Sequence, residues 1–505
     1  MGQLGLTLIL SMLLFCCAFF LKGQAQRFIF WLFLSAIIAL SVLYSVSDFY
    51  TGEGVTEATI FHILYGWRGL PPVQIFWIGS VVIIYASIIF ILISLLLRYR
   101  FEKYFPFPVA SFLLAFSASL FSVATHPAVT QLANIYGALR SEKHSYYLDQ
   151  EVNKDDYVVN GETKKSLVYL YLESYERTFF DEYAYPDLAS GLKAIKDSAL
   201  DFSNIHQSPL TQWTMAGIAA SQCGIPLAST KLSRPESKVS QFLIPGSKCI
   251  SDILFQDGYS VTYMGGADLA FSSKDVFFES HNFDKAYGLK YFQKRFPAMP
   301  TSSWGVYDDF LFERAIEEIE ADLESGGPFA FFMLTLDTHS PNGHVTPSCE
   351  KDDSYASLNN PMLDAVKCSD RLASQFINDL KDMLVKYDRN DVVIVVSSDH
   401  LQMQSTTLDT LLSYQDKRRN LFFIIDSEQQ GHLIDRAGTT MDIAPTVLSI
   451  LGWDVTSLAL GRNLLSEEKT LIEKYGYAVF NSMVMGWQGY LWRNSIQARK
   501  KPGSE

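Results

Sequence analysis

Side chains of the kinds that bind divalent metal ions follow two short apolar runs of the sequence. Glu173 follows Leu167–Leu172, and Asp399 and His400 follow Val392–Ser397. Oxygen and nitrogen ligands in this mixture suit manganese, zinc or magnesium. Glu173 alone could be a solvated charge near a helix start, and Asp399 alone could be a helix cap. Their joint occurrence at predicted strand ends favours a metal site.

A hydroxyl near the start of a small-residue helix is the second feature that could do chemistry. Thr211 and Thr214 precede the stretch Met215–Ser221, which is rich in Ala and Gly. A Thr at a helix start is most often an N-cap, and the residue pattern alone favours this role. The alternative is a metal-activated nucleophile, with backbone N–H groups of the helix holding an anionic phosphoryl oxygen.

Apolar runs alternate with amphipathic helical stretches after residue 165, and this arrangement must position the candidate residues. The predicted strands are Leu167–Leu172, Ser260–Met264, Phe329–Leu336, Val392–Ser397 and Leu421–Ile425. The clearest predicted helices are Val306–Leu323 and Pro361–Lys386. The alternation predicts an α/β/α domain with a mostly parallel central sheet. Ligands bind beyond the carboxyl ends of the strands in such folds, which is where the candidate residues stand.

Four long, uncharged apolar runs precede residue 126. They are Leu4–Leu21, Phe28–Ser47, Val73–Leu97 and Phe107–Ala124. Each is about long enough to cross a bilayer as a helix, so residues 1–125 are predicted to form a four-helix transmembrane anchor. A signal peptide is the alternative for the first run, although Lys22 follows that run and no basic residue precedes it. Buried core helices are the alternative for the others, and their length argues against it.

Charge separates this anchor from the remainder. Residues 1–125 hold six Lys or Arg and four Asp or Glu, whereas the whole chain of 505 residues has a formal net charge of −13. Such an acidic total argues against a nucleic-acid-binding protein.

The loops after the first and third runs are basic, and Asp48–Gln74 is acidic, so the positive-inside rule places Asp48–Gln74 and everything after Thr125 outside the cytoplasm. We expect a linker with an amphipathic helix over 126–165, a catalytic domain over 166–470 and a C-terminal extension over 471–505.

The cysteines follow the same division. Cys16 and Cys17 lie in the first apolar run, and the other four lie in the predicted outer part. An even number in an oxidising compartment predicts two disulfides. Four cysteines allow three pairings, of which we favour the sequence-local one, Cys223–Cys249 and Cys349–Cys368.

Longer motifs surround the candidate residues. Leu172-Glu173-Ser174, Ser397-Ser398-Asp399-His400, the run 440–452 and the spacing of Thr214 from Gly224 together resemble the alkaline phosphatase/sulfatase superfamily. The closer motifs are Glu173-Ser-Tyr-Glu-Arg-Thr, Trp213-Thr-Met-Ala-Gly, Lys274-Asp-Val-Phe-Phe, Trp304-Gly-Val-Tyr-Asp-Asp and Leu336-Asp-Thr-His-Ser-Pro. These resemble the phosphoglycerol transferases that decorate osmoregulated periplasmic glucans and are related to lipoteichoic acid synthases. That branch usually continues for a few hundred residues past its catalytic domain, whereas this sequence stops at Glu505.

The resemblance implies roles for particular residues. Glu173, Asp399 and His400 would bind a divalent metal, with manganese preferred over zinc or magnesium. Thr214 would be the fourth ligand and the catalytic nucleophile.

The resemblance also implies two substrate-binding residues. His339 matches a position that contacts the substrate phosphate, and Trp304 matches a Trp near the glycerol phosphate. The alternatives are a strand-end His339 bonded to Asp337 and a Trp304 that belongs to the core.

The activity that the resemblance implies is transfer of glycerol phosphate from phosphatidylglycerol to a periplasmic glucan, through a covalent threonine intermediate, by a multi-pass protein of the cell inner membrane. One alternative is a phosphoethanolamine transferase that modifies lipid A or another surface glycan. Another is a non-enzymatic membrane sensor with a sulfatase-like domain, although such a domain would be expected to have lost a ligand.

The topology is directly testable. A reporter that is active only in the periplasm, fused after Glu505, should be active because the basic loops hold the anchor in the predicted orientation. A fusion that is stably expressed but silent would contradict the predicted topology.

Overall fold

The structure is a computed structural model that describes residues 24–66, 68–98, 108–140, 148, 150–152, 157–159, 164–227, 248–352, 355 and 357–487. These residues form two compact units. One unit comprises the described residues of 1–60 and 71–137, and the other comprises those of Phe61–Leu70 and 138–505. Each unit is described by itself below.

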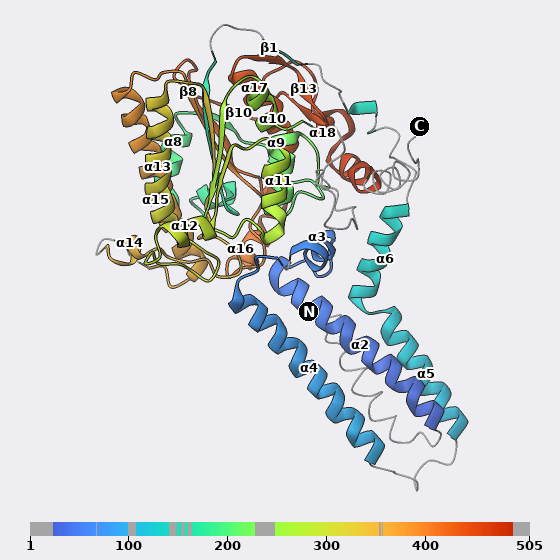
Figure 1. The fold of residues 1–505 in the computed structure, drawn as a ribbon. Coiled ribbons are helices and arrows are strands. Elements are labelled where there is room, and N and C mark those ends of the chain that lie inside the picture. The colour runs from blue at the N-terminus through green and yellow to red at the C-terminus, as the bar shows by residue number, and fades with distance from the viewer. Residues whose placement is uncertain are drawn as a thin grey trace, which may run out of the picture. The chain divides into compact units, whose positions relative to one another are not determined.

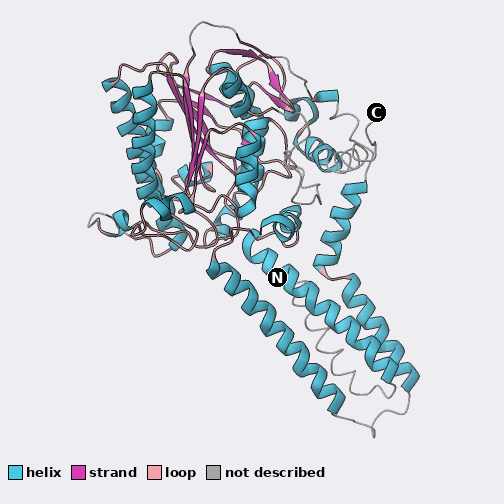
Figure 2. Ribbon diagram, in the orientation of Figure 1, coloured by secondary structure: helices cyan, strands magenta, loops and turns pink. Residues whose placement is uncertain are grey.

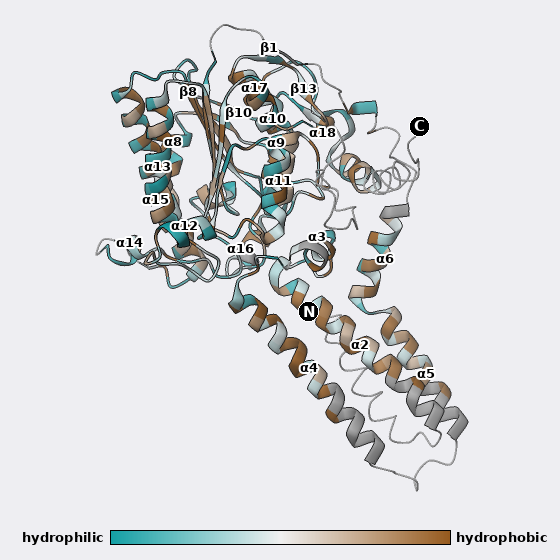
Figure 3. Cartoon of the chain, in the orientation of Figure 1, coloured by the Kyte–Doolittle hydropathy of each residue, from teal (hydrophilic) through white to brown (hydrophobic). Residues whose placement is uncertain are grey.

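The first unit is helical. Its helices are α2 (Gln24–Thr51), α3 (Glu57–Phe61), α4 (Pro72–Arg98), α5 (Pro108–Ala124) and α6 (Pro127–Arg140). Helix α2 packs against both α4 and α5. The coloured parts of these three helices are largely hydrophobic in the hydropathy view (Figure 3). This composition is what the sequence led us to expect of an anchor.

The anchor itself remains a prediction. One described helix, over Leu32–Thr51 in α2, is long and apolar enough to cross a membrane, and the apolar part of α4 over Pro72–Ile88 is shorter. The predicted runs Phe28–Ser47, Val73–Leu97 and Phe107–Ala124 coincide largely with α2, α4 and α5. The run Leu4–Leu21 lies outside the described residues.

The second unit is built on an eight-stranded sheet with helices on both faces (Figures 1 and 2). In spatial order its strands are β10 (His432–Ile434), β3 (Leu200–Phe202), β9 (Phe422–Ile425), β8 (Val392–Ser398), β2 (Ser166–Leu172), β7 (Phe329–Leu334), β5 (Ser260–Gly265) and β6 (Lys285–Tyr287). All neighbouring pairs are parallel except those made by β9. The predicted mostly parallel sheet is therefore confirmed.

Successive side chains along each strand lie on opposite faces of the sheet, so both faces receive residues from every strand. Leu170 and Leu172 belong to one buried core with Phe376 and Ile377 of α15 (Pro361–Lys386) and Ile319 of α13 (Asp308–Ser325). The long run of apolar residues in each central strand follows from burial on both faces.

Helix α9 (Thr214–Cys223) covers the opposite face. The hydroxyl groups of Tyr171 and Ser221 lie 2.9 Å apart, and the rings of Tyr169 and Tyr171 stack with centroids 4.2 Å apart. Gly217 makes this packing close, since a Cβ atom there would lie 1.9 Å from the carbonyl oxygen of Asp399. Helix α9 is thus held directly against the carboxyl end of β8.

The predicted elements and the observed ones agree for the long segments. Helix α15 has the predicted bounds, because the Asn360 side chain caps its first turn and Pro361 begins it. The polar stretch that we expected to be part of a linker contains β1 (Tyr157–Val159), which pairs with β12 (Trp453–Val455). The described end of the expected linker is therefore attached to the second unit.

Both predicted disulfides are present. Cys223–Cys249 joins the last residue of α9 to the residue before α10 (Ile250–Gln256), and Cys349–Cys368 joins α14 (Pro347–Glu350) to α15. The first bridge tethers the carboxyl end of α9 at a sequence separation of 26 residues.

Gly217→Ala should destabilise the second unit, because its methyl group has no room beside the Asp399 carbonyl. Overpacking of this kind costs about 1–3 kcal/mol, so the melting temperature should fall. Gly327→Ala is the matched control, since a Cβ atom there meets nothing within 4 Å. Equal melting temperatures for the two variants would show that α9 does not pack as closely as described.

Candidate metal centre

The three predicted ligands meet at the carboxyl edge of the sheet. Leu172 of β2 is paired with Ser398 of β8, which sets Glu173 and Asp399 beside each other at the strand ends. His400 Nε2 lies 3.4 Å from Glu173 Oε1 and 3.3 Å from Asp399 Oδ2. One ligand atom from each of these buried residues lies within 4.8 Å of the others. The topology therefore brings together what the sequence places 226 residues apart.

Hydrogen bonds fix the orientation of each ligand. His400 Nδ1 is 2.8 Å from the Leu401 carbonyl oxygen, so Nδ1–H donates there and Nε2 keeps its lone pair for a metal. Ser174 donates its hydroxyl to Glu173 Oε1 at 2.8 Å and its backbone N–H to Asp399 Oδ1 at 2.8 Å. Ser174 does this in the left-handed region, with φ of 54°. Such a conformation persists only where the surroundings hold it in place.

The pKa values of the three buried residues show that the cluster favours additional positive charge. Burial, and after it the negative charge of Glu173, raises the pKa of Asp399 to about 7. Burial opposes ionisation of Glu173, but the hydrogen bond to His400 and the charges of His339 and His400 outweigh it and lower the pKa to about 2. Burial is likewise outweighed at His400, whose pKa the two carboxylates raise to about 9. Without another positive charge nearby, the buried carboxylates therefore favour the protonated forms of Asp399 and His400.

Asp399 carries the clearest sign of a missing partner. Its Oδ1 accepts hydrogen bonds from Ser174 N and His400 N, whereas its buried Oδ2 accepts none from the described residues and has His400 Nε2 as an ion-pair neighbour at 3.3 Å. An orphaned buried carboxylate oxygen is costly unless something neutralises it. The chemistry of the donor set and this open oxygen both fit a divalent metal ion.

Thr214 stands beside this cluster. It is the first residue of α9, while Trp213 occupies the N-cap position without a side-chain capping bond. Thr214 Oγ1 is 3.5 Å from Glu173 Oε2, and the Thr214 side chain is not needed as a cap. The N-cap role that residue pattern alone favoured is therefore wrong for Thr214, and its hydroxyl faces the candidate metal ligands.

Thr211 has a different environment. It is fully buried, and its hydroxyl donates to the Ser208 carbonyl oxygen at 2.7 Å. It neither caps α9 nor faces the cluster, so the helix start offers one hydroxyl to the site.

His339 and Trp304 lie together, with ring centroids 4.0 Å apart. His339 follows β7, and its Nδ1 is 2.8 Å from the Ser340 carbonyl oxygen, which directs Nε2 elsewhere. Burial lowers the pKa of His339, while the charge of Glu173 acts in the opposite direction. Asp337 is not its partner, because an Asp337 carboxylate oxygen accepts from the Asp308 backbone N–H at 2.7 Å instead.

Lys274 is a residue near the site to which sequence reasoning gave no role. Only 3% of it is exposed, and its ammonium group lies 4.9 Å from the centre of the Phe271 ring. Burial lowers its pKa to about 8, against the opposing charges of Glu173, Asp268 and Asp399. A lysine in a polar stretch gives no sequence sign of burial, although it begins one of the quoted motifs.

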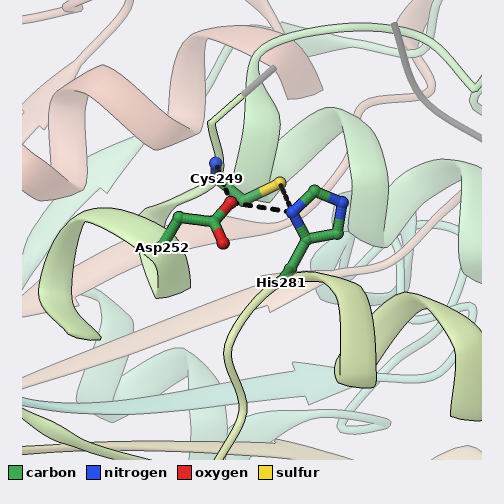
Figure 4. Close-up of side chains that lie close together, drawn as sticks. All are labelled: Cys249, Asp252 and His281. Carbon is green, nitrogen blue, oxygen red and sulfur yellow. Dashed lines mark hydrogen bonds and ion pairs between the residues drawn. The ribbon is translucent and has the colours of Figure 1, made fainter. Parts of the chain in front are cut away.

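A second cluster of ligand-type side chains is structural. Cys249, Asp252 and His281 lie close together (Figure 4). His281 Nδ1 is 2.7 Å from Asp252 Oδ2 and 3.3 Å from Cys249 Sγ. Because that sulfur is already bonded to Cys223, it is no thiolate ligand. The cluster supports the disulfide that tethers α9.

Comparison with known proteins agrees with the two units. The sulfatase family model matches residues 165–453, and the model of the phosphoglycerol transferase I N-terminal domain matches residues 6–146. Proteins called phosphoglycerol transferase I from Shigella boydii and Salmonella choleraesuis are 36% and 37% identical over 442 and 439 residues. These matches cover 86% of this chain and 56% of each relative, so the chain spans about half the length of the curated relatives it matches.

Two solved structures share the fold. A protein of the alkaline phosphatase superfamily from Vibrio parahaemolyticus has a TM-score of 0.50 at 24% identity, covering 67% of this chain and 78% of its own. A lipoteichoic acid synthase from Listeria monocytogenes has a TM-score of 0.50 at 16% identity, covering 72% of this chain and 100% of its own. With the family match extending over more than half of the residues, and the ligand cluster at the expected edge of the sheet, the chain belongs to the sulfatase family.

Proposed function

We propose that this protein transfers glycerol phosphate from phosphatidylglycerol to a hydroxyl group of a periplasmic glucan or related glycan. The observation that carries the proposal is the position of Thr214, whose hydroxyl at the start of α9 lies 3.5 Å from the Glu173 carboxylate. A hydroxyl beside a divalent-metal site is the arrangement of an activated nucleophile. The names of the relatives support glycerol phosphate as the group transferred.

The nucleophile acts first in the proposed mechanism. Glu173, Asp399 and His400 would hold a divalent ion, which when bound supplies the positive charge that lowers the pKa of a nearby hydroxyl. The Thr214 oxygen attacks the donor phosphorus, a Thr214 O–P bond forms, and the P–O bond to diacylglycerol breaks. The proton that the Thr214 hydroxyl loses is balanced by the one that the leaving diacylglycerol oxygen gains, and glycerol phosphate remains on Thr214.

Cationic and N–H groups stabilise the negative charge that develops on the phosphoryl oxygens in the transition state. The first backbone N–H groups of α9 have no acceptor within the helix and can donate to a phosphoryl oxygen. A bound phosphate beside His339 opposes the effect of burial on the imidazole, so we infer that His339 is protonated in the complex and donates through Nε2. In the second step an acceptor hydroxyl attacks the same phosphorus, the Thr214 O–P bond breaks, and Thr214 recovers its proton.

The proposed location is the bacterial inner membrane, with the catalytic unit in the periplasm. The basic and acidic loops, the apolar helices and the two disulfides support this location. A membrane anchor would keep the nucleophile close to its lipid donor and so raise the donor's effective concentration.

We expect manganese to be the ion bound. Adding Mn²⁺ to chelator-treated protein should raise its melting temperature, because a ligand at about 100 times its Kd stabilises by about 2.7 kcal/mol. Glu173→Gln should remove this rise, whereas Glu318→Gln, which changes a carboxylate on α13, should keep it. An equal rise in Glu173→Gln would place the ion elsewhere, and a larger rise with Zn²⁺ or Mg²⁺ would identify another metal.

Thr214→Ala should lower transfer by several orders of magnitude, as expected on deletion of a covalent nucleophile. Thr211→Ala is the matched control and should lose about 1 kcal/mol of stability with transfer largely retained. The measurement is transfer of label from head-group-labelled phosphatidylglycerol to a glucan acceptor, with folding checked by thermal melting.

The same assay with labelled phosphatidylethanolamine identifies the donor. Near-normal turnover by Thr214→Ala would contradict the proposed nucleophile. Preferential use of phosphatidylethanolamine by the unmodified protein would replace the proposed donor while keeping the chemistry.

A further inference from the structure

The Phe61–Leu70 segment belongs to the catalytic unit, although the residues on either side of it in sequence belong to the helical unit. Phe61 is only 1% exposed. Gly69 adopts a φ of 71°, and a side chain there would lie 2.5 Å from the backbone nitrogen of Phe271. Phe61 and Gly69 are therefore closely packed, although Ile63 between them is exposed.

Its first two residues pack on the tryptophan that precedes the candidate nucleophile. The Phe61 and Trp213 rings have centroids 4.5 Å apart, and the His62 and Trp213 rings have centroids 5.0 Å apart. Trp213 is 7% exposed and holds the N-cap position of α9 with extended φ and ψ angles of −148° and 157°. The Trp213 side chain makes no capping bond at this end of α9, and the packing of Phe61 and His62 against Trp213 supports it.

The other contacts of the segment reach residues around Lys274. His62 Nε2 lies 3.1 Å from Ser272 Oγ, and Arg68 pairs with Asp275 at 3.1 Å. Ser272 and the next residue, Ser273, both adopt left-handed conformations with φ of 56° and 58°. The segment thus contacts the strained turn that immediately precedes Lys274.

Aromatic rings continue from this turn to the predicted substrate-binding residues. His62 lies 5.9 Å from Phe271, Phe271 lies 5.9 Å from Trp304, and Trp304 lies 4.0 Å from His339, measured between ring centroids. A single aromatic cluster therefore joins the segment both to Trp213 beside the nucleophile and to His339.

We infer that Phe61 and His62 are positioning residues for the proposed transfer reaction: through Trp213 they hold the first turn of α9, and hence the Thr214 hydroxyl, in line with the donor phosphorus. The inference rests on the proposed function, because it gives the segment a role in that reaction. It also requires Phe61–Leu70 to lie on the same side of a membrane as the catalytic unit. A displacement of about 1 Å at a nucleophile can lower a rate by about a hundredfold, so loose packing at Trp213 should be costly.

The test uses the full chain in vesicles that contain phosphatidylglycerol. Phe61→Ala should lower kcat about tenfold to a hundredfold with little change in KM, since the donor still binds but meets a displaced nucleophile. Phe61→Leu, which restores most of the volume, should recover most of the rate. Ile63→Ala is the matched control in the same segment, because Ile63 is 60% exposed. Equal kcat values for Phe61→Ala and Ile63→Ala would overturn the inference.

A double-mutant cycle shows whether Phe61 acts through Trp213. In a Trp213→Leu background, Phe61→Ala should have little further effect, because the ring that it supports is already gone. If the double variant instead lost kcat by the product of the two single-variant factors, the residues would act independently and the inference would be overturned. His62→Gln, which keeps a hydrogen-bonding group for Ser272 but loses the ring, should show a partial loss of kcat.

Amide hydrogen exchange separates this inference from the proposed function. Peptides that cover residues 210–218 should exchange faster in Phe61→Ala than in Ile63→Ala, whichever lipid is the donor. Unchanged exchange would overturn the positioning role even if the protein transfers glycerol phosphate. Faster exchange in a protein that does not use phosphatidylglycerol would support the positioning role and refute the proposed donor.

Discussion

Burial of two carboxylates beside an imidazole is the constraint on which the rest of this structure depends. Glu173, Asp399 and His400 are all nearly inaccessible to solvent, and one oxygen of Asp399 has no hydrogen-bond partner among the residues that the structure describes. In a low-dielectric interior such a cluster is stable only with compensating positive charge. Protons supply part of that charge at Asp399 and His400, and a divalent ion would supply it more fully. The sheet provides the position, because parallel strands bring their carboxyl ends to one edge.

The hydroxyl that we propose as the nucleophile must then be placed against this cluster with little freedom. Close packing at Gly217, the Tyr171–Ser221 contact and the Cys223–Cys249 bridge hold the body and the carboxyl end of α9. At the amino end, where Thr214 stands, the Trp213 side chain makes no capping bond, and aromatic rings pack against it. In our account the Phe61–Leu70 segment completes this support, so a catalytic unit without that segment lacks part of its own site.

Much of this architecture was predictable from the sequence, for identifiable reasons. The central strands are continuous apolar runs because both faces are buried, and α15 has an amphipathic pattern between clear end signals. The ligands were predictable because they directly follow those strands, and the disulfides because the cysteines fall in close pairs. The edge strands β6 and β10, and β3 next to β10, contain three residues each, too few to show a pattern.

Other features depend on contacts that no local pattern encodes. Lys274 stands in a polar stretch, and its burial comes from packing beside Phe271. Phe61 and His62 occur in what looks like an ordinary loop between apolar runs, yet they pack on a residue about 150 positions later. The residue pattern alone favoured an N-cap role for Thr214, whereas the resemblance implied a nucleophile, and the structure places Trp213 in the N-cap position.

Mass spectrometry of the protein after incubation with phosphatidylglycerol and Mn²⁺, without a glycan acceptor, tests the central claim most directly. The account predicts a glycerophosphate adduct on the peptide that contains α9, located on Thr214 by fragmentation and released when a glucan acceptor is added. An adduct on another residue, or turnover of the donor without any adduct under conditions that trap one, would contradict the account.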